Sequence, residues 1–223
     1  MKILNSLCFN VVKVLLLRQE DIQFIGPLKY TPELALIIED FTSKQNTVKA
    51  PYLEEDFQKN IESDLKLKEN SMHFYALKDN RILTYLRLTP NSFELSRLSS
   101  LFSSKIESFS DYYEISRLNT DYTLNDKSHY ARLLLFKAGL WLFSETNARG
   151  LIGICKVTKE RYFQQFGMTL IAKDYIEARE ATYNLIAGSK EKILITVLKQ
   201  FWNKIKLNTI GDFYESRKTT RKT

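Results

Sequence analysis

Hydrophobic residues change their spacing several times along the chain, and these changes predict an alternation of helices and strands. Apolar and β-branched residues fill 9–18, which favours a first strand, with a short amphipathic helix as the alternative. The sequence Thr-Pro-Glu at 31–33 is a helix start, with a capping hydroxyl, proline in the first turn and a carboxylate near the positive end of the dipole. Apolar residues carry this helix to about Ser43. Pro51 begins a second predicted helix, apolar on one face and acidic on the other.

The period then shortens to the alternation that is typical of strands. Two such segments, 72–77 and 81–88, flank Asp79-Asn80, a dipeptide suited to a tight hairpin turn. The serine-rich stretch 91–110 shows neither period and is interpreted as irregular. Another strand is predicted over 112–121.

Further elements follow in the second half of the chain, and their order predicts the fold class. They are a buried helix over 129–147, a strand over 151–155, a helix over 158–166, strands over 168–175 and 181–187, and an amphipathic helix over 190–206. This order predicts one α/β layered domain on a mixed sheet over 1–188. Residues 189–223 then form a basic helix and tail.

The positive charge of the protein is concentrated in that last segment. Nine Lys or Arg residues stand there against three acidic residues, so 189–223 carries +6 of the net +7. Three interpretations of the helix 190–206 stay open: a helix packed on the domain, an amphipathic helix at a membrane surface, or a dock for an acidic partner. Nucleic acid is not an expected partner, because no basic patch interleaved with aromatic residues is present.

Cysteine and histidine are too few for a disulfide framework or a transition-metal site. Cys8 and Cys155 are far apart with apolar neighbours, which favours buried free thiols in a reducing compartment. Asn5, Asn10 and Lys13 interrupt the apolar N-terminus, and no small-residue cleavage site follows them. No stretch approaches the length of a membrane span. We therefore expect a cytoplasmic protein, in contact with the membrane only if 190–206 binds there.

The strand at 112–121 carries charges that need an explanation. Charged residues in an internal strand must be paired or must face a cleft, and Glu114 and Arg117 lie here with Ser116. Arg87 lies near the end of the preceding strand. These residues form either a structural ion-pair network or a catalytic site. On a regular strand positions 114 and 117 face opposite sides, so both reach one cleft only if the strand is bulged or strongly twisted.

Three short segments resemble one enzyme family. They are Tyr-Leu-Arg-Leu-Thr-Pro at 85–90, Glu-Ile-Ser-Arg-Leu at 114–118 and Arg-Tyr-Phe-Gln-Gln-Phe-Gly-Met at 161–168. In this order of elements they resemble the GNAT acyltransferases, and within them the acyl-homoserine-lactone synthases and the related N-acyl amino acid synthases. The resemblance implies a mixed central sheet flanked by helices. It also implies transfer of an acyl group from an acyl carrier protein or acyl-CoA, as co-substrate, to a small-molecule amine, with no permanently bound cofactor and no metal. Acyl carrier proteins are acidic, so the basic C-terminal segment would attract one.

The same resemblance suggests roles for individual residues. Glu114 is the candidate base, because a carboxylate on a partly buried strand has a raised pKa. Arg87 and Arg117 either hold it ionised or bind a carboxylate of the substrate, beside Ser116. The expected donor-binding residues are Leu118, Asn119 and Thr120, through their backbone N–H groups, and Phe163.

The sequence also departs from common members of the family. No glycine occurs between Arg117 and Gly139, so the Gly-rich loop that binds a pyrophosphate in many acetyltransferases is missing. Phe163 stands where many of them have a tyrosine acid, which leaves Tyr162 or another group as proton donor. Residues 18–60 contain no set that matches the adenosylmethionine site of lactone synthases, so the acceptor is expected to be another amine. The alternatives are an acetyl-CoA-dependent N-acetyltransferase and a non-catalytic module that binds a membrane or an acidic protein.

Overall fold

A computed structural model describes residues 21–49, 67–91 and 93–199. The strand predicted over 9–18, the helix predicted from Pro51, Cys8 and the part of the C-terminal segment after residue 199 lie outside the described residues.

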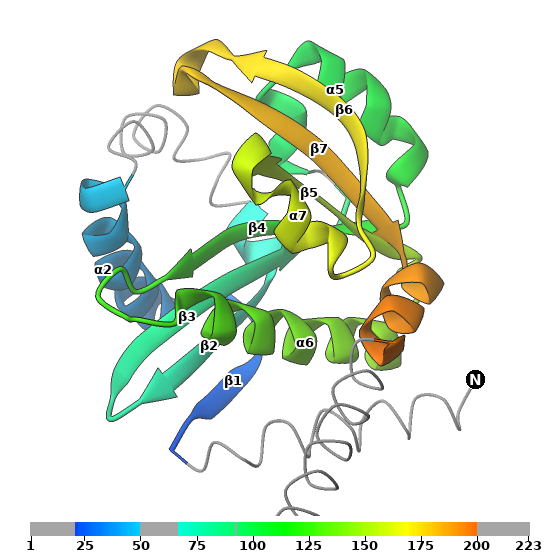
Figure 1. Cartoon of the computed structure of the whole chain (residues 1–223). Helices are drawn as coiled ribbons and strands as arrows, with labels where there is room; N and C mark the ends of the chain where they lie inside the picture. Colours follow the sequence, from blue (N-terminus) through cyan, green and yellow to red (C-terminus); the bar gives the residue numbers. More distant parts are fainter. Residues whose placement is uncertain (1–20, 50–66, 92, 200–223) are drawn as a thin grey trace, which may run out of the picture.

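The described residues form a seven-stranded mixed sheet in the order β1-β2-β3-β4-β5-β7-β6 (Figure 1). Neighbouring strands are antiparallel except β4 and β5, which are parallel. The strands are β1 (Gln23–Leu28), β2 (Met72–Lys78), β3 (Arg81–Thr89), β4 (Tyr112–Thr120), β5 (Gly150–Lys156), β6 (Thr169–Ile176) and β7 (Ala181–Ser189).

Helices cover both faces of this sheet. The α-helices are α2 (Pro32–Lys49), α5 (Ser100–Ile106), α6 (Lys127–Glu145) and α7 (Glu160–Gln164), and residues 190–199 form a further helix. The 3-10 helices are η1 (Glu94–Arg97), η2 (Glu107–Phe109), η3 (Val157–Lys159) and η4 (Glu177–Arg179). On one face, α6, α7 and 190–199 pack on the main core; on the other, α2 covers β1–β3, and η1 and α5 cover β5–β7 (Figure 1). Within the described part of the chain, no helix is both long and apolar enough to cross a bilayer.

The mixed sheet with flanking helices confirms the predicted fold class. The hairpin between β2 and β3 follows from its turn residues. Asp79 and Asn80 have φ values of +48° and +59°, as a type I′ turn requires, and Asn and Asp tolerate this region better than most residues. The apolar helix predicted at 129–147 is α6, which is capped by Asp126 and is largely buried.

Two sequence-based predictions miss elements of the fold. The strand β1 was not predicted, because no element was assigned between 18 and Thr31. Its Pro27 is tolerated since β1 is an edge strand. The irregular stretch predicted at 91–110 is wrong, since it contains η1, α5 and η2. Ser99 caps α5 by accepting the Phe102 N–H, and Phe102 packs in the core. This helix was not predicted because serine has only a modest helix propensity and because α5 contains few apolar residues.

The helix 190–199 packs against the domain. Ile193 is buried in the main core, with Leu194 and Val197 beside it. Lys190 donates from Nζ to the Phe143 carbonyl at 2.6 Å, which ties the start of this helix to α6. The described part of the C-terminal segment thus belongs to the same core as the sheet.

Candidate active site

A cavity opens where β4 and β5 separate. The parallel pairing of these strands ends at Ile115 and Gly153, although β4 continues to Thr120 and β5 to Lys156. A cavity of about 740 Å³ lies at this divergence and is lined by residues of both strands. The end of the β4–β5 ladder thus leaves the last residues of β4 beside a space large enough for a ligand.

A β-bulge in β4 lies at the edge of this cavity. Tyr85 of β3 pairs with Asn119, and Arg87, two residues later, pairs with Ser116, three residues earlier on β4. One extra residue is therefore accommodated in β4. Arg117 lies in this interval with φ of +54°, a left-handed conformation that is unfavourable for a non-glycine residue. The strand is bulged where a shared site requires it.

The bulge brings charged side chains from β4 to one side of the sheet. Ile115 faces the core beside α6, whereas Glu114 faces η1 on the opposite side. Arg117 also reaches η1, because its Nη2 lies 2.7 Å from Oε1 of Glu94. A regular strand would have placed Glu114 and Arg117 on opposite faces. The two residues now line one cavity.

Glu94, the first residue of η1, holds the charged groups together. Its Oε2 lies 2.5 Å from Nη2 of Arg87, and its backbone N–H donates to Oε2 of Glu114 at 2.6 Å. Arg87 also donates from Nε to Ser116 Oγ at 3.0 Å. One carboxylate therefore bridges both arginines, and the same residue supplies a backbone donor to Glu114.

Glu114 is only 3% exposed, and its environment favours the protonated form. Burial and then the neighbouring Glu94 charge raise the pKa of Glu114 from 4.5 to about 8. Arg87 and the N–H groups of Glu94 and Leu95 oppose this rise. A carboxyl group with a pKa near neutrality can gain and lose a proton during a reaction cycle.

Most of the predicted site residues lie around this cavity. Arg87 does not: it is 1% exposed and lies beneath the cavity, bound to Glu94 and Ser116, so it is placed to orient those groups. The predicted residues that line the cavity are Glu114, Ser116, Arg117, Leu118, Asn119, Thr120 and Phe163.

Sequence analysis missed several groups that line the same cavity. Glu94 lies in the stretch interpreted as irregular, seven residues after Arg87 and twenty before Glu114, and only the folded structure brings it into contact with both. Arg179 and Tyr183 come from the far end of the chain. Tyr162, which the sequence offered as an alternative proton donor, also lines the cavity; it donates to the Ser128 carbonyl at 3.5 Å, and burial raises the pKa of its hydroxyl, so it stays protonated.

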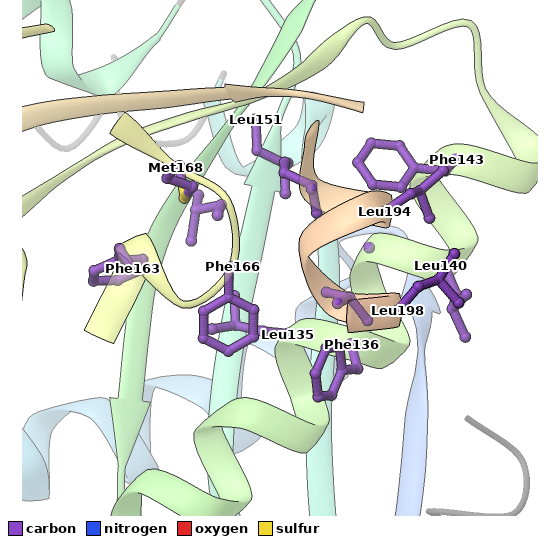
Figure 2. Close-up of a pocket in the computed structure, with 14 residues that line it drawn as sticks. Leu135, Phe136, Leu140, Phe143, Leu151, Phe163, Phe166, Met168, Leu194 and Leu198 are labelled. Atoms are coloured by element: carbon purple, nitrogen blue, oxygen red, sulfur yellow. The ribbon is translucent and has the colours of Figure 1, made fainter. Parts of the chain in front are cut away.

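A second, apolar pocket adjoins the cavity. It is lined by α6, α7, β5 and the helix 190–199, and Ile115, Phe163 and Met168 line both spaces. Figure 2 shows Phe136, Leu140 and Leu198 at the end of the pocket away from Phe163 and Met168. The second space is therefore a small apolar pocket, of about 40 Å³, that lies beside the cavity.

Gly139, in the middle of α6, lines this apolar pocket. A Cβ atom built there meets no other atom within 4 Å, so the glycine is not required by a close contact. Glycine inside a helix costs roughly 0.5–1 kcal/mol relative to alanine. The absence of a side chain at this position leaves more room in the pocket than any other residue would leave.

The N-terminus of α6 is already occupied by a side chain. Asp126 Oδ1 accepts the His129 N–H at 3.1 Å and the Ser128 hydroxyl at 3.1 Å. A helix N-terminus without such a cap attracts a phosphate, whereas this one meets a carboxylate of the chain itself. Lysines 127, 156 and 159 line the cavity near this point and supply positive charge instead.

Comparisons with known proteins agree on the fold. No protein-family model matches the sequence, and a search of curated proteins finds no similar sequence. An acyl-CoA N-acyltransferase from Pseudomonas aeruginosa matches with a TM-score of 0.52 and 15% identity over 75% of this chain and 98% of its own. FeeM, an N-acyl amino acid synthase from uncultured soil microbes, matches with a TM-score of 0.54 and 12% identity over 77% of this chain and 92% of its own.

The chain has the GNAT acyl-CoA N-acyltransferase fold. The diverging β4 and β5 and the bulge at Arg117 are the parts of this GNAT fold that form the cavity.

Proposed function

We propose that the protein is an N-acyltransferase that moves an acyl group longer than acetyl from a thioester to a small-molecule amine. The observation that carries this proposal is the bulged β4, which brings Glu114 and Arg117 together on the wall of the cavity where β4 and β5 separate. The GNAT fold of the two acyltransferases that match this chain supports the general reaction.

Glu114 acts as the base in the proposed reaction. It removes a proton from the ammonium group of the acceptor, directly or through water, and the free amine nitrogen attacks the thioester carbon. The new C–N bond gives a tetrahedral oxyanion, which the backbone N–H groups of Leu118 and Thr120 stabilise; the Asn119 N–H points to β3 instead. The oxyanion then collapses and the C–S bond breaks; the nitrogen loses its second proton to give the neutral amide, and the leaving thiolate takes up a proton to give the free thiol. Tyr162 lines the cavity with its hydroxyl protonated and is placed among the groups that supply the proton of the thiol.

The apolar pocket favours an acyl group longer than acetyl. An acetyl group needs no hydrophobic extension, whereas a hydrocarbon chain gains about 0.8 kcal/mol for each CH₂ removed from water. The pocket between α6 and 190–199 has a volume of about 40 Å³ and shares Phe163 and Met168 with the cavity, so these side chains offer apolar surface to the carbons next to the reacting carbonyl. Gly139 of α6 lines this pocket, and no neighbouring atom would clash with a Cβ atom there.

The donor is an acyl carrier protein thioester or an acyl-CoA. Both carry a phosphopantetheine arm, and the lysines at 127, 156 and 159 are available for its phosphate. The carboxylate of Asp126 at the N-terminus of α6 disfavours the compact binding of a pyrophosphate there. This favours the acyl carrier protein, which presents one phosphate, over coenzyme A.

A thiol-release assay tests the proposal. Acetyl to dodecanoyl thioesters, each carried on coenzyme A or on acyl carrier protein, are mixed with the protein and a panel of amino acids and other amines. We expect free thiol and an N-acylated product with the longer chains, and a loss of most of it in Glu114→Gln. Release only from acetyl-CoA would replace the proposal by N-acetyl transfer. No release with any donor and amine would overturn it.

A further inference from the structure

Arg179 is an arginine of the cavity that forms no ion pair with the described acids. It ends η4, in the connection between β6 and β7, and lines the cavity. Its guanidinium carbon lies 5.5 Å from the centre of the Tyr183 ring. Its Nε is buried and has no hydrogen-bond partner among the described residues. A buried donor that lines a cavity without a protein partner is suited to a ligand.

Three arginines that lie on or close to β3 and β4 differ from Arg179. Arg87 and Arg117 are both paired with Glu94, and Arg81, on the same strand as Arg87, is paired with Asp121. Their charges are compensated within the protein. The described acids form no such pair with Arg179, so its guanidinium can bind an anionic group of a ligand.

Arg179 lies on the same side of the sheet as the proposed base. Tyr183 packs in the cluster that includes Leu95 of η1, and the Leu95 N–H points to Glu114. Lys127 lies at the start of α6 and Lys159 in η3, whereas Lys156 pairs with Tyr183 across β5 and β7 and so lies on the same face as Arg179. Arg179 and Lys156 therefore lie on the side of the proposed base, and Lys127 lies at the start of α6.

We propose that Arg179 binds a carboxylate carried by the acceptor amine, which makes the acceptor an amino acid or a related amino acid analogue. This inference rests on the proposed acyl transfer. A guanidinium held over an aromatic ring is restrained in orientation while its in-plane N–H groups can still form two parallel hydrogen bonds to a carboxylate. The carboxylate of the acceptor would then lie on one side of its reacting nitrogen, and Glu114 would lie on the other side.

A binding experiment tests this without catalysis. N-decanoylglycine and N-decanoylglycinamide share the acyl chain and the new amide bond and differ in the carboxylate, so calorimetry with both isolates its contribution. We expect the wild-type protein to bind the acid about tenfold or more tighter than the amide, which corresponds to roughly 1.4 kcal/mol. In Arg179→Gln this preference disappears while the affinity for the amide is kept. Arg161→Gln, an exposed arginine on α7, is the matched control and keeps the preference.

Each other outcome has a definite meaning. Equal affinities of the wild-type protein for acid and amide, or a preference that survives in Arg179→Gln, would overturn the inference and leave the proposed acyl transfer standing. Binding of neither compound would count against both the inference and the proposed acyl transfer.

A kinetic assay gives a second test. Arg179→Gln should raise KM for amino acids and leave KM for the thioester unchanged. A rise only in the thioester KM would mean that Arg179 binds the donor phosphate. If the protein binds the carboxylate but releases no thiol, Arg179 forms an anion-binding site and the acyl-transfer proposal is wrong.

Discussion

Glu94 donates its backbone N–H to Oε2 of Glu114 at 2.6 Å, while its own carboxylate is bound by two arginines. The same residue thus acts on Glu114 in two opposing ways. Its N–H stabilises the ionised form of Glu114, and its charge favours the protonated form. The balance keeps Glu114 in place and keeps its pKa well above that of an exposed glutamate.

Replacement of Glu114 by Gln should remove the base and preserve the shape of the site. General base catalysis contributes about 10²–10⁴-fold to a rate, so we expect a loss of that order in kcat/KM, measured as thiol release. The amide still accepts the N–H of Glu94 through its oxygen, so the unfolding temperature should change little. A variant with the wild-type rate would show that Glu114 is not the base.

The rate should depend on pH through Glu114. Because its pKa is raised to about 8, kcat/KM should increase with pH and level off above about pH 8. The measurement is a pH–rate profile with a donor whose own hydrolysis is subtracted. A profile that is flat between pH 6 and 9 would contradict the assignment of Glu114.

The stability of the protein should also depend on pH through Glu114. The folded state holds the proton more tightly than the unfolded state, whose pKa is near 4.5, so this group contributes stability below pH 4.5 that is lost as the pH rises through about 8. The difference in unfolding temperature between the wild-type protein and Glu114→Gln should therefore change steadily across that range. If the two proteins respond to pH in parallel, the carboxyl group titrates near its ordinary value.

Replacement of Glu94 by Gln should shift the pH–rate profile to lower pH. The variant removes the charge that raises the pKa of Glu114 and releases Arg87 and Arg117 to stabilise the carboxylate. Infrared difference spectra of the Glu114 carboxyl group measure this shift directly. Glu107→Gln, on the exposed surface of η2, is the matched control and should leave the profile unchanged. A lower rate with an unshifted profile would mean that Glu94 is only structural.

Changes at Gly139 should separate stability from chain-length preference. Alanine finds open space there and removes a helix-interior glycine, so Gly139→Ala should raise the free energy of unfolding by about 0.5–1 kcal/mol. Gly139→Leu should fill part of the apolar pocket and raise KM for long-chain thioesters more than for short ones. Chemical denaturation and a donor-length series measure the two effects. An unchanged length preference in the leucine variant would place the acyl chain elsewhere.

Local sequence patterns were sufficient for much of the fold. Alternation around Asp79-Asn80 predicts the β2–β3 hairpin, because turn residues and period act over a few positions. The all-round apolar run at 129–147 predicts a buried helix, which is α6. The pattern of hydrophobic and polar residues did not predict β1 or α5. In β1 an edge position tolerates proline, and in α5 contacts with the core outweigh the modest propensity of serine.

The sequence alone determined that the charges of 112–121 need either a partner or a cleft, and that a shared site requires a bulge between Glu114 and Arg117. Those conclusions follow from the alternation of side chains along a strand and from the cost of burying charge. Only the tertiary structure decided that the strand is bulged, that Glu94 is the partner of both arginines and that Arg179 lines the same cavity. These relations join residues far apart in the chain, and no local pattern encodes them, because they depend on how the sheet and its flanking helices pack together.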